Sequence, residues 1–599
     1  MSTTPCQPPV PEDGRKAQRP AAAMDPKGTV PFSSDPASPG ARNWDSPPLD
    51  VFPPGAGPLS PQAEARWIWA FLIIGLTLRL TRYILRFPLW EDEACLAANF
   101  LDRGYLDLLK PCDYCVVAPP LFLWLQLAMV KLLGYTEYTL RLVPFLCGMA
   151  SLVLFRHVAG RLLRGTALVL AVGIFAVSYP MTRYAAEAKP YAADLLVALV
   201  MLALLFEWLR RPGENRWLWG LAAMIGPAIG YSFAAAFMGG AVSLVLGCVL
   251  WSSGRRGWLP WMVYNLVLVG SFACLLAVTN SGVADSTRAY MEDLHWAGAF
   301  PPLAHPLELA GWLASIHTGG MLGYPVGGPH GGSALSLVFC LAGVAVLARR
   351  RQGLLLGILL APLGLNFIAA AMHRYPYGGH VRLQLFLAPA FSILIGLGIA
   401  AVLAWHARRR STEEGSRRPL VAALAVLAAL GGASLLRDLC QPYKSGTTLR
   451  AREFARWFWF DLAHQGELVC FETDLKESLT PGKRQCAWSS LYYCNQRIYS
   501  PQHARGELPQ WDRISADWPL RCVLYRSPAE ERDSPAADPH VREHWLERME
   551  SQYRLVAHDS YPMPAYDKSD RRPISDDFIE VFKFVPRGET ASRSPAGRY

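Results

Sequence analysis

Residues 354–371 read LLLGILLAPLGLNFIAAA, a run in which no residue is charged. At 1.5 Å per residue, a helix of this length is about 27 Å long, close to the roughly 30 Å of a bilayer's hydrocarbon core. A buried helix of a large soluble protein would place a polar face at every third or fourth position, and this run has none. It therefore predicts a membrane-spanning helix.

Similar apolar runs recur along the chain, which is 52% apolar and has a positive mean hydropathy of +0.17. The sequence predicts an α-helical polytopic membrane protein with about eleven transmembrane helices. The predicted spans are 67–88, 142–160, 165–181, 192–209, 216–233, 234–251, 259–278, 334–349, 353–373, 383–405 and 419–436.

The first 65 residues differ from the rest of the chain, because they hold fifteen prolines and no apolar run. This composition predicts a disordered Pro-rich tail. A signal peptide is excluded, since the first apolar run begins only at Trp67.

The net charge of +10 does not indicate nucleic-acid binding, because the basic residues form no single patch with interleaved aromatic residues. They lie in short connections that the predicted spans place on one side of the membrane. These residues are Arg156, Arg161, Arg164, Arg210, Arg211, Arg216, Arg255, Arg256, Arg349, Arg350, Arg351, Arg408, Arg409 and Arg410. The positive-inside rule makes that side cytoplasmic, which places the tail inside and residues 437–599 outside.

The outer side of this topology also holds three consecutive carboxylates, Glu91, Asp92 and Glu93, directly after the first span. These residues alone are compatible with two interpretations, a solvated loop and a functional site. A carboxylate at the mouth of an apolar bundle can act as a general base toward a hydroxyl, with a neighbour that orients the substrate. Three arginines, Arg79, Arg82 and Arg86, share a helical face that leads to Asp92, and they either snorkel to the headgroups or hold a phosphate.

The first outer loop, 94–110, has an amphipathic pattern that predicts an interfacial segment. It is followed by Cys112 and Cys115, which could form a disulfide in an oxidising exterior; a zinc site lacks its further ligands. Apolar and aromatic residues continue over 118–124, again at headgroup depth.

Two further outer segments combine cations, aromatic residues and turn formers. In the first, Arg183 and Glu187 are four residues apart and could simply pair, while Lys189 and Tyr191 flank a proline and could face a phosphate or sugar. The second segment, 373–382, is either an interfacial turn or a site for an anionic, hydroxylated ligand. Its donor groups are those of His373, Arg374, Tyr375, Tyr377, His380 and Arg382.

Beyond Leu436 the apolar pattern changes to alternation, which predicts short strands at 467–471, 521–525, 553–557 and 578–584 after a helix at 447–464. We therefore expect a small C-terminal α/β domain over 437–599. The cysteines Cys470, Cys486, Cys494 and Cys522 could pair there, with a connectivity that the sequence does not define.

In their order along the chain, these motifs resemble the membrane-embedded C-type glycosyltransferases, which include protein O-mannosyltransferases, the aminoarabinose transferase of lipid A and lipopolysaccharide galacturonosyltransferases. The resemblance covers about residues 67–405. The motifs are Trp90-Glu-Asp-Glu93, Ala118-Pro-Pro-Leu121, Leu133-Gly-Tyr-Thr-Glu-Tyr-Thr-Leu-Arg-Leu142, Tyr184-Ala-Ala-Glu-Ala-Lys-Pro-Tyr191 and Tyr375-Pro-Tyr-Gly-Gly379.

The resemblance implies an inverting hexosyl- or pentosyltransferase of the bacterial inner membrane. It would move a sugar from a polyprenyl-phosphate donor to a lipid, glycan or protein hydroxyl on the extracytoplasmic face, in lipopolysaccharide or protein glycosylation. Asp92 and Glu93 would be the catalytic carboxylates. The donor phosphate and substrate would meet Arg79, Arg82, Glu187, Lys189, Tyr191, Tyr375, His380 and Arg382.

One position departs from the family pattern. Relatives often carry His, Lys or an acid directly before the first-loop Pro-Pro pair, where this chain has Val117 and Ala118. A divalent metal is therefore not required by the motif, and the arginines and Lys189 would neutralise the phosphate. The rival interpretation is a transporter or flippase of a lipid-linked glycan, which would show internal repeats and charges at the midplane. A noncatalytic receptor would leave the outer motifs unexplained.

Overall fold

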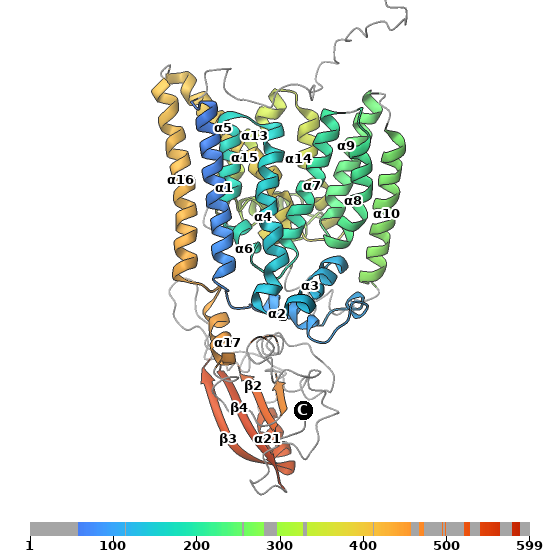
Figure 1. The fold of residues 1–599 in the computed structure, drawn as a ribbon, viewed down its shortest axis with the longest axis vertical. Coiled ribbons are helices and arrows are strands. Elements are labelled where there is room, and N and C mark those ends of the chain that lie inside the picture. Colours follow the sequence, from blue (N-terminus) through green and yellow to red (C-terminus); the bar gives the residue numbers. More distant parts are fainter. Residues whose placement is uncertain are drawn as a thin grey trace, which may run out of the picture.

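The computed structural model shows a long helical bundle with a small β-sheet at one of its ends (Figure 1). The residues that the structure describes are 58–113, 116–211, 213–253, 257–280, 296, 298–327, 332–410, 413–456, 467–471, 494, 498, 520–526, 540–562 and 578–587. Most of the predicted Pro-rich tail, 1–57, lies outside them.

Nine helices of the described part of the chain are long and apolar enough to cross a membrane, and each coincides with a predicted span. They comprise α1 (Pro61–Ile84), α4 (Glu137–Leu162), α7 (Tyr191–Arg210), α9 (Ala235–Ser253), α10 (Trp258–Asn280), α13 (Gly332–Arg349), α14 (Gly353–Ala371), α15 (Ala388–Arg410) with the preceding turn η4 (Val381–Leu387), and α16 (Glu413–Cys440). The polytopic helical fold class is thus confirmed.

Two of the eleven predicted spans are shorter than a bilayer requires. Helix α5 (Gly165–Val177) ends early because Ser178 is extended (ψ 116°) and Pro180 begins a separate short helix, α6 (Tyr179–Tyr184). Helix α8 (Arg216–Tyr231) ends where Ser232 turns extended. The predicted spans 165–181 and 216–233 are thus helices of 13 and 16 residues, shorter than the nine long ones.

The ends of α1 also differ from the predicted span of 67–88. The helix begins at Pro61, capped by the Ser60 side chain, and ends at Ile84. Arg86 has a left-handed φ of 48°, and Pro88 follows two residues later, so the chain cannot continue as a helix.

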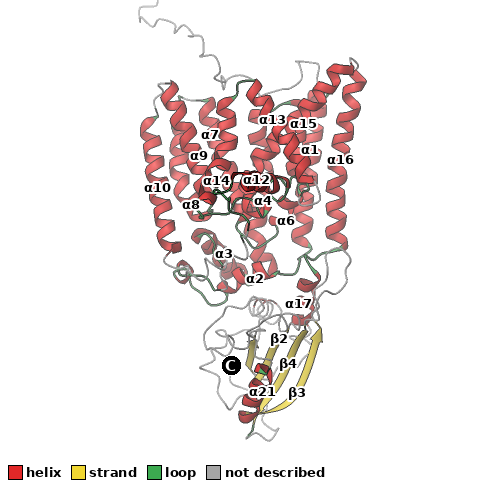
Figure 2. Ribbon diagram, turned by 180° about the vertical axis from the view of Figure 1, so that it is seen from behind, coloured by secondary structure: helices red, strands yellow, loops and turns green. Residues whose placement is uncertain are grey.

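The predicted interfacial loop is a series of short elements: α2 (Glu91–Ala97), η1 (Ala98–Phe100), η2 (Asp107–Leu109) and the apolar helix α3 (Pro120–Leu133). All lie at the end of the bundle that faces the sheet (Figure 1). Cys112 is a free thiol, which does not match a bridge to Cys115, a residue outside the described part. A further short helix, α12 (Pro306–Thr318), appears at about half the height of the bundle in Figure 2.

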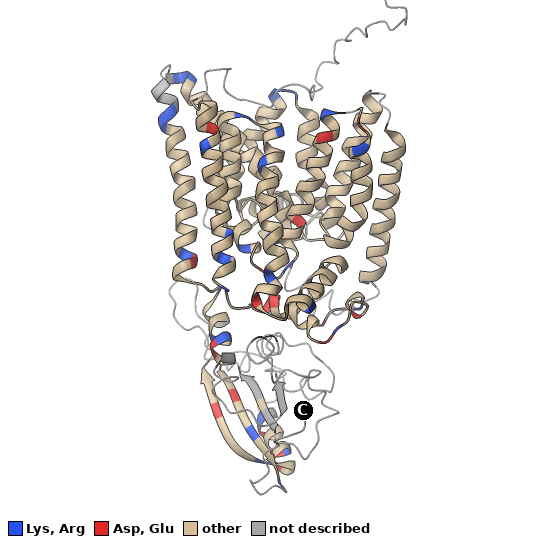
Figure 3. Ribbon diagram, viewed as in Figure 1, with Lys and Arg blue, Asp and Glu red and all other residues tan. Residues whose placement is uncertain are grey.

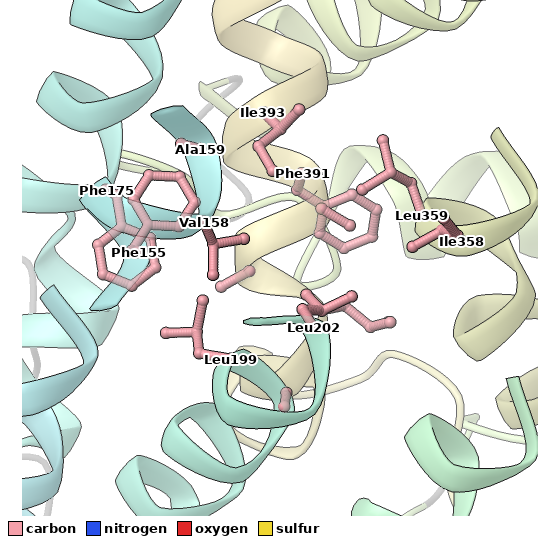
Figure 4. Packing of buried hydrophobic residues seen from close by; sticks show 14 of the residues in the cluster. Phe155, Val158, Ala159, Phe175, Leu199, Leu202, Ile358, Leu359, Phe391 and Ile393 are labelled. Atoms are coloured by element: carbon pink, nitrogen blue, oxygen red, sulfur yellow. The ribbon is translucent and has the colours of Figure 1, made fainter. Parts of the chain in front are cut away.

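The bundle core is formed by side chains from helices far apart in the sequence (Figure 4). Phe155 of α4 stacks on Phe175 of α5 with a centroid distance of 4.0 Å. Close backbone contact also contributes: a Cβ at Gly398 of α15 would collide with the carbonyl oxygen of Phe339 on α13. Dispersion and small-residue packing of this kind hold helices together in a lipid environment.

The C-terminal sheet has four strands in the order β1-β2-β4-β3, with β1 parallel to β2 and the other pairs antiparallel. The strands are β1 (Glu467–Phe471), β2 (Leu520–Arg526), β3 (Tyr553–Pro562) and β4 (Phe578–Pro586), and α21 (Val541–Gln552) packs on them through Trp545. All four predicted strands are confirmed. Cys494 and Cys522 are free thiols.

Helix α17 (Gly446–Arg456) connects α16 to the sheet, and it matches the first part of the helix predicted at 447–464; residues 457–464 lie outside the described part. Its Arg452 forms a 2.7 Å ion pair with Glu137 of α4 and also donates to the carbonyl oxygen of Arg86. These contacts fasten α17 to the sheet-facing end of the bundle.

The arginine-rich connections α4–α5, α7–α8, α13–α14 and α15–α16 lie at the opposite end of the bundle (Figure 3). Acidic residues of α2 lie at the sheet-facing end. The charges therefore differ between the two ends, as the spacing of the spans predicted.

Candidate active site

Asp92 is the centre of the candidate site. It lies in the first turn of α2, and its two oxygens bind two different cations: Lys189 Nζ lies 2.7 Å from Oδ1, and Arg382 Nη1 lies 2.8 Å from Oδ2. Lys189 comes from the α6–α7 connection and Arg382 from η4. Three predicted site residues thus lie in contact: Asp92 binds both Lys189 and Arg382, although Asp92 and Arg382 are 290 positions apart in the chain.

The electrostatic environment keeps Asp92 ionised. Burial favours the neutral carboxyl, but the charges of Lys189 and Arg382, with a smaller contribution from Lys444, lower the pKa of Asp92 to about 2. The two cations outnumber the single carboxylate, so this group of three carries one net positive charge. Such a cluster is suited to a further anion.

Glu93, the second predicted catalytic carboxylate, points away from this cluster. It is 1% exposed and accepts two hydrogen bonds from Arg141 of α4, from Nε at 2.8 Å and from Nη2 at 2.7 Å. The backbone N–H of Ala188 donates a third, at 2.7 Å. Glu93 therefore joins α2 to α4 and to the connection that carries Lys189.

Glu187 and Arg183 form the i, i+4 pair that their spacing predicted, with Arg183 Nε 2.7 Å from Oε1. The other oxygen, Oε2, is buried and has no hydrogen-bond partner in the described part of the chain. Burial opposes ionisation, yet the charges of Arg183 and Lys444 hold the pKa of Glu187 below its usual value. Glu187 is thus an ionised acceptor whose second oxygen has no hydrogen bond among the described residues.

Aromatic rings surround the cations of the site. Arg382 lies over the rings of Trp90, at 5.6 Å, and Tyr191, at 5.9 Å. Tyr191 makes an edge contact with Tyr184, whose pKa burial raises to about 12, so its hydroxyl remains a donor. These rings hold the guanidinium in place through cation–π contacts.

Arg79 and Arg82 are buried on α1, but each is engaged elsewhere. Arg79 Nη1 donates to the carbonyl oxygens of Gly75 (2.9 Å) and Ala176 (3.1 Å), which binds α1 to α5. Arg82 Nη1 contacts both oxygens of Asp438 on α16, at 2.8 and 2.7 Å. Snorkelling is therefore wrong for these two residues, and neither contacts Asp92.

Tyr375 and His380 also lie outside the cluster around Asp92. The Tyr375 hydroxyl donates to the carbonyl oxygen of Leu383 at 3.2 Å, and its ring packs on Phe237. His380 is exposed and precedes η4. Both therefore help to shape the turn that carries Arg382.

The structure adds site residues that the sequence did not select. Arg141 belongs to the motif at 133–142, but its partner Glu93 is 48 residues away. Trp90 is the first residue of the acidic motif, and its ring carries no sign of its role in the sequence. Lys444 lies beyond the last span, in a stretch without any motif, and its ammonium group contacts the Trp90 ring.

Within the described residues, no group of three or more His, Cys, Asp and Glu side chains could hold a metal ion. The oxygens of Asp92 are instead bound by cationic side chains. We therefore derive no chemical step through a metal.

Residues 117–279 match the family described as dolichyl-phosphate-mannose-protein mannosyltransferase. A comparison with curated proteins found no match. Among solved structures, ArnT from Cupriavidus metallidurans bound to undecaprenyl phosphate is 14% identical, with a TM-score of 0.46 over 87% of this chain and 98% of that chain. The Archaeoglobus fulgidus oligosaccharyltransferase in the apo form is 12% identical, with a TM-score of 0.41 over 86% and 76%.

Proposed function

We propose that this protein is a C-type membrane glycosyltransferase, which transfers a sugar from a polyprenyl-phosphate donor to a hydroxyl of a lipid, glycan or protein. The family match over residues 117–279 supports this proposal. One observation carries the proposal: Asp92 is held between Lys189 and Arg382. A carboxylate beside two cations supplies a base and a phosphate site at the same place.

The ligand-free site is a poor base, because a carboxylate with a pKa of about 2 accepts a proton only weakly near neutral pH. A donor phosphate changes this situation, since its oxygens compete with Asp92 for Lys189 and Arg382. When those cations turn to the phosphate, the pKa of Asp92 rises toward its usual range. Donor binding thus produces the base that the reaction needs.

The reaction is then a single displacement. The acceptor oxygen forms a bond to the anomeric carbon, the bond from that carbon to the phosphate oxygen breaks, and the acceptor proton passes to Asp92. The bond electrons leave with the polyprenyl phosphate, whose growing negative charge Lys189 and Arg382 stabilise. Attack opposite the leaving group predicts inversion at the anomeric carbon.

The other carboxylates have supporting roles in this scheme. Glu187, with Oε2 unpartnered among the described residues, can accept a hydrogen bond from a sugar hydroxyl. Glu93 positions α2 through Arg141 and fixes the backbone beside Lys189. Tyr191 lies against Arg382, and Tyr375 and His380 belong to the turn that carries it. Arg79 and Arg82 act at a distance from the centre, by joining α1 to α5 and α16.

We place this end of the bundle on the extracytoplasmic face, since the arginine-rich connections lie at the other end. The N-terminal tail, 1–65, would then be cytoplasmic, and a C-terminal α/β domain, 437–599, would cover the donor site from outside. The bacterial inner membrane is the location that the resemblance of the sequence motifs implies.

The test replaces Asp92 by Asn or Ala in a host strain that lacks its own copy of the gene, with glycolipids and glycoproteins resolved by mass. Loss of a general base lowers the rate by about 10²–10⁴-fold. Glu91→Gln is the matched control, because Glu91 is an exposed carboxylate on the same turn. Product formation at the wild-type rate in both Asp92 variants would exclude the catalytic assignment.

A second measurement separates donor from acceptor. Lys189→Ala and Arg382→Ala should weaken binding of a polyprenyl monophosphate to the purified protein, whereas Asp92→Asn should preserve or strengthen it by releasing both cations. Equal loss in all three variants would indicate a structural role for the cluster.

A further inference from the structure

Lys444 lies in the short connection between α16, which ends at Cys440, and α17, which begins at Gly446. It therefore comes from the connection to the C-terminal sheet rather than from the transmembrane segments that carry the family match. Its ammonium group nevertheless contacts the indole of Trp90, two residues before Asp92. Arg382 lies over the same ring, at 5.6 Å.

Ion pairs on both sides of this connection fix its position relative to the bundle. On the α16 side, Asp438 receives two hydrogen bonds from the buried Arg82. On the α17 side, Arg452 pairs with Glu137, whose side chain is 1% exposed. Buried charge pairs of this kind fix geometry, because separation would leave a charge without its partner.

No ion pair or hydrogen bond of Lys444 occurs within the described part of the chain, although charged groups face it from three elements. Its charge interacts with Glu93 on α2, with Arg183 and Glu187 on α6 and its following connection, and with Arg382 on η4. The charge of Lys444 also lowers the pKa of Asp92. Lys444 is thus a partly buried amine beside the cationic side of the site, where its contact among the described residues is an aromatic ring.

We propose that Lys444 is a further ligand of the donor phosphate, delivered to the site by the connection between the last span and the C-terminal sheet. This inference rests on the proposed function. It explains why an amine shares the Trp90 ring with Arg382 rather than lying in solvent, where a lysine is better hydrated. The chemical class of the ligand is a lipid-linked phosphate.

The acid–base properties of the amine give this role its own signature. Burial, with the nearby charges of Arg183 and Arg382, lowers the pKa of Lys444 to about 6, against the opposing effect of Glu187 and Glu93. Without ligand, the neutral and the charged amine therefore coexist near neutral pH. A bound phosphate raises its pKa, so binding takes up a proton, and affinity falls with rising pH above about 6.

The experiment measures binding of geranylgeranyl phosphate to the full-length protein in nanodiscs between pH 6 and 8. Lys444→Met should weaken binding about tenfold at pH 6, as expected for loss of one charge-assisted hydrogen bond. Lys444→Arg, which stays charged, should bind well over the whole range. The ligand's own ionisation is common to all variants, so the Lys444 contribution is the difference between their pH profiles.

Lys131→Met is the matched control, because Lys131 also lies over an aromatic ring, that of Tyr105 at 4.5 Å, on the peripheral helix α3. It should bind as the wild-type protein does. Equal affinity and equal pH profiles for wild-type and Lys444→Met would overturn the inference while leaving the proposed function intact. Failure of the wild-type protein to bind the phosphate would instead count against the proposed function itself.

Discussion

Replacement of Glu93 by Gln separates a structural role from a catalytic one. In the structure, Glu93 accepts two hydrogen bonds from Arg141 and one from the Ala188 N–H, all between 2.7 and 2.8 Å. Gln preserves the size of the side chain and one acceptor oxygen. It removes the negative charge and turns an amide N–H₂ group toward the guanidinium, so Arg141 becomes an unpaired buried charge.

The magnitude depends on the burial of the pair, whose side chains are 1% and 3% exposed. Removing one partner of a buried ion pair costs about 3–5 kcal/mol. Arg141 keeps its hydrogen bonds to the carbonyl oxygens of Phe87 and Pro88, which offset part of that loss. We therefore expect a loss of about 3 kcal/mol in the free energy of unfolding, at the lower end of that range.

The assay is unfolding of the purified protein in mixed micelles, with a denaturing detergent as titrant, for Glu93→Gln, Arg141→Met and the double variant. The double variant should recover part of the loss, with a coupling of about 1–3 kcal/mol. Glu91→Gln, on the exposed side of the same turn, should change stability by no more than about 0.5 kcal/mol. Unchanged stability of Glu93→Gln together with abolished transfer would refute the structural role and return Glu93 to the reacting centre.

Three further predictions use other parts of the molecule. The ion pairs of Asp92 lower its pKa to about 2 from 3.8, so they contribute about 2 kcal/mol to the free energy of unfolding above pH 4. This contribution is lost as the pH falls toward 2. The acid unfolding curve of Asp92→Asn should lack it, and a curve parallel to that of the wild-type protein would contradict the prediction. Arg452→Met should release α17 from Glu137 and increase protease cleavage between the bundle and the sheet. Cleavage at the wild-type rate would show that the ion pair does not fasten α17. Gly398→Val should lower the stability of the protein by about 1–3 kcal/mol in thermal unfolding in detergent, because its side chain would collide with α13. Gly432→Val, with open space around its Cβ, should not. Tolerance of both substitutions would mean that α15 can move away from α13.

Local patterns predicted the elements of the fold more accurately than their lengths. Nine predicted spans are long helices in the structure. About twenty consecutive apolar residues favour a membrane-spanning helix whatever segments surround them, so the sequence alone predicts such a helix. Alternation likewise predicted four strands at 467–471, 521–525, 553–557 and 578–584. The helices predicted at 165–181 and 216–233 end early, at Val177 and Tyr231, because Ser178 and Ser232 adopt extended backbone, which apolar composition does not report.

The candidate site was partly predicted. The acidic motif and the two cationic segments identified Asp92, Lys189 and Arg382, which the structure brings together. The partners of Glu93 and Arg82 could not be predicted, since Arg141 and Asp438 reach them only through the packing of α4 and α16.

The sequence by itself determined that this chain spans a membrane and gathers its charged motifs at one end, because hydropathy and charge act locally along the chain. Asp92 and Glu93 are adjacent in the sequence. Only the tertiary structure decided that Asp92 binds Lys189 and Arg382, whereas Glu93 is buried in an ion pair with Arg141. Consecutive residues of a helix point about 100° apart, so the direction in which α2 packs assigns them to different neighbours. The same packing brought Lys444 to Trp90, a contact between residues that share no local pattern.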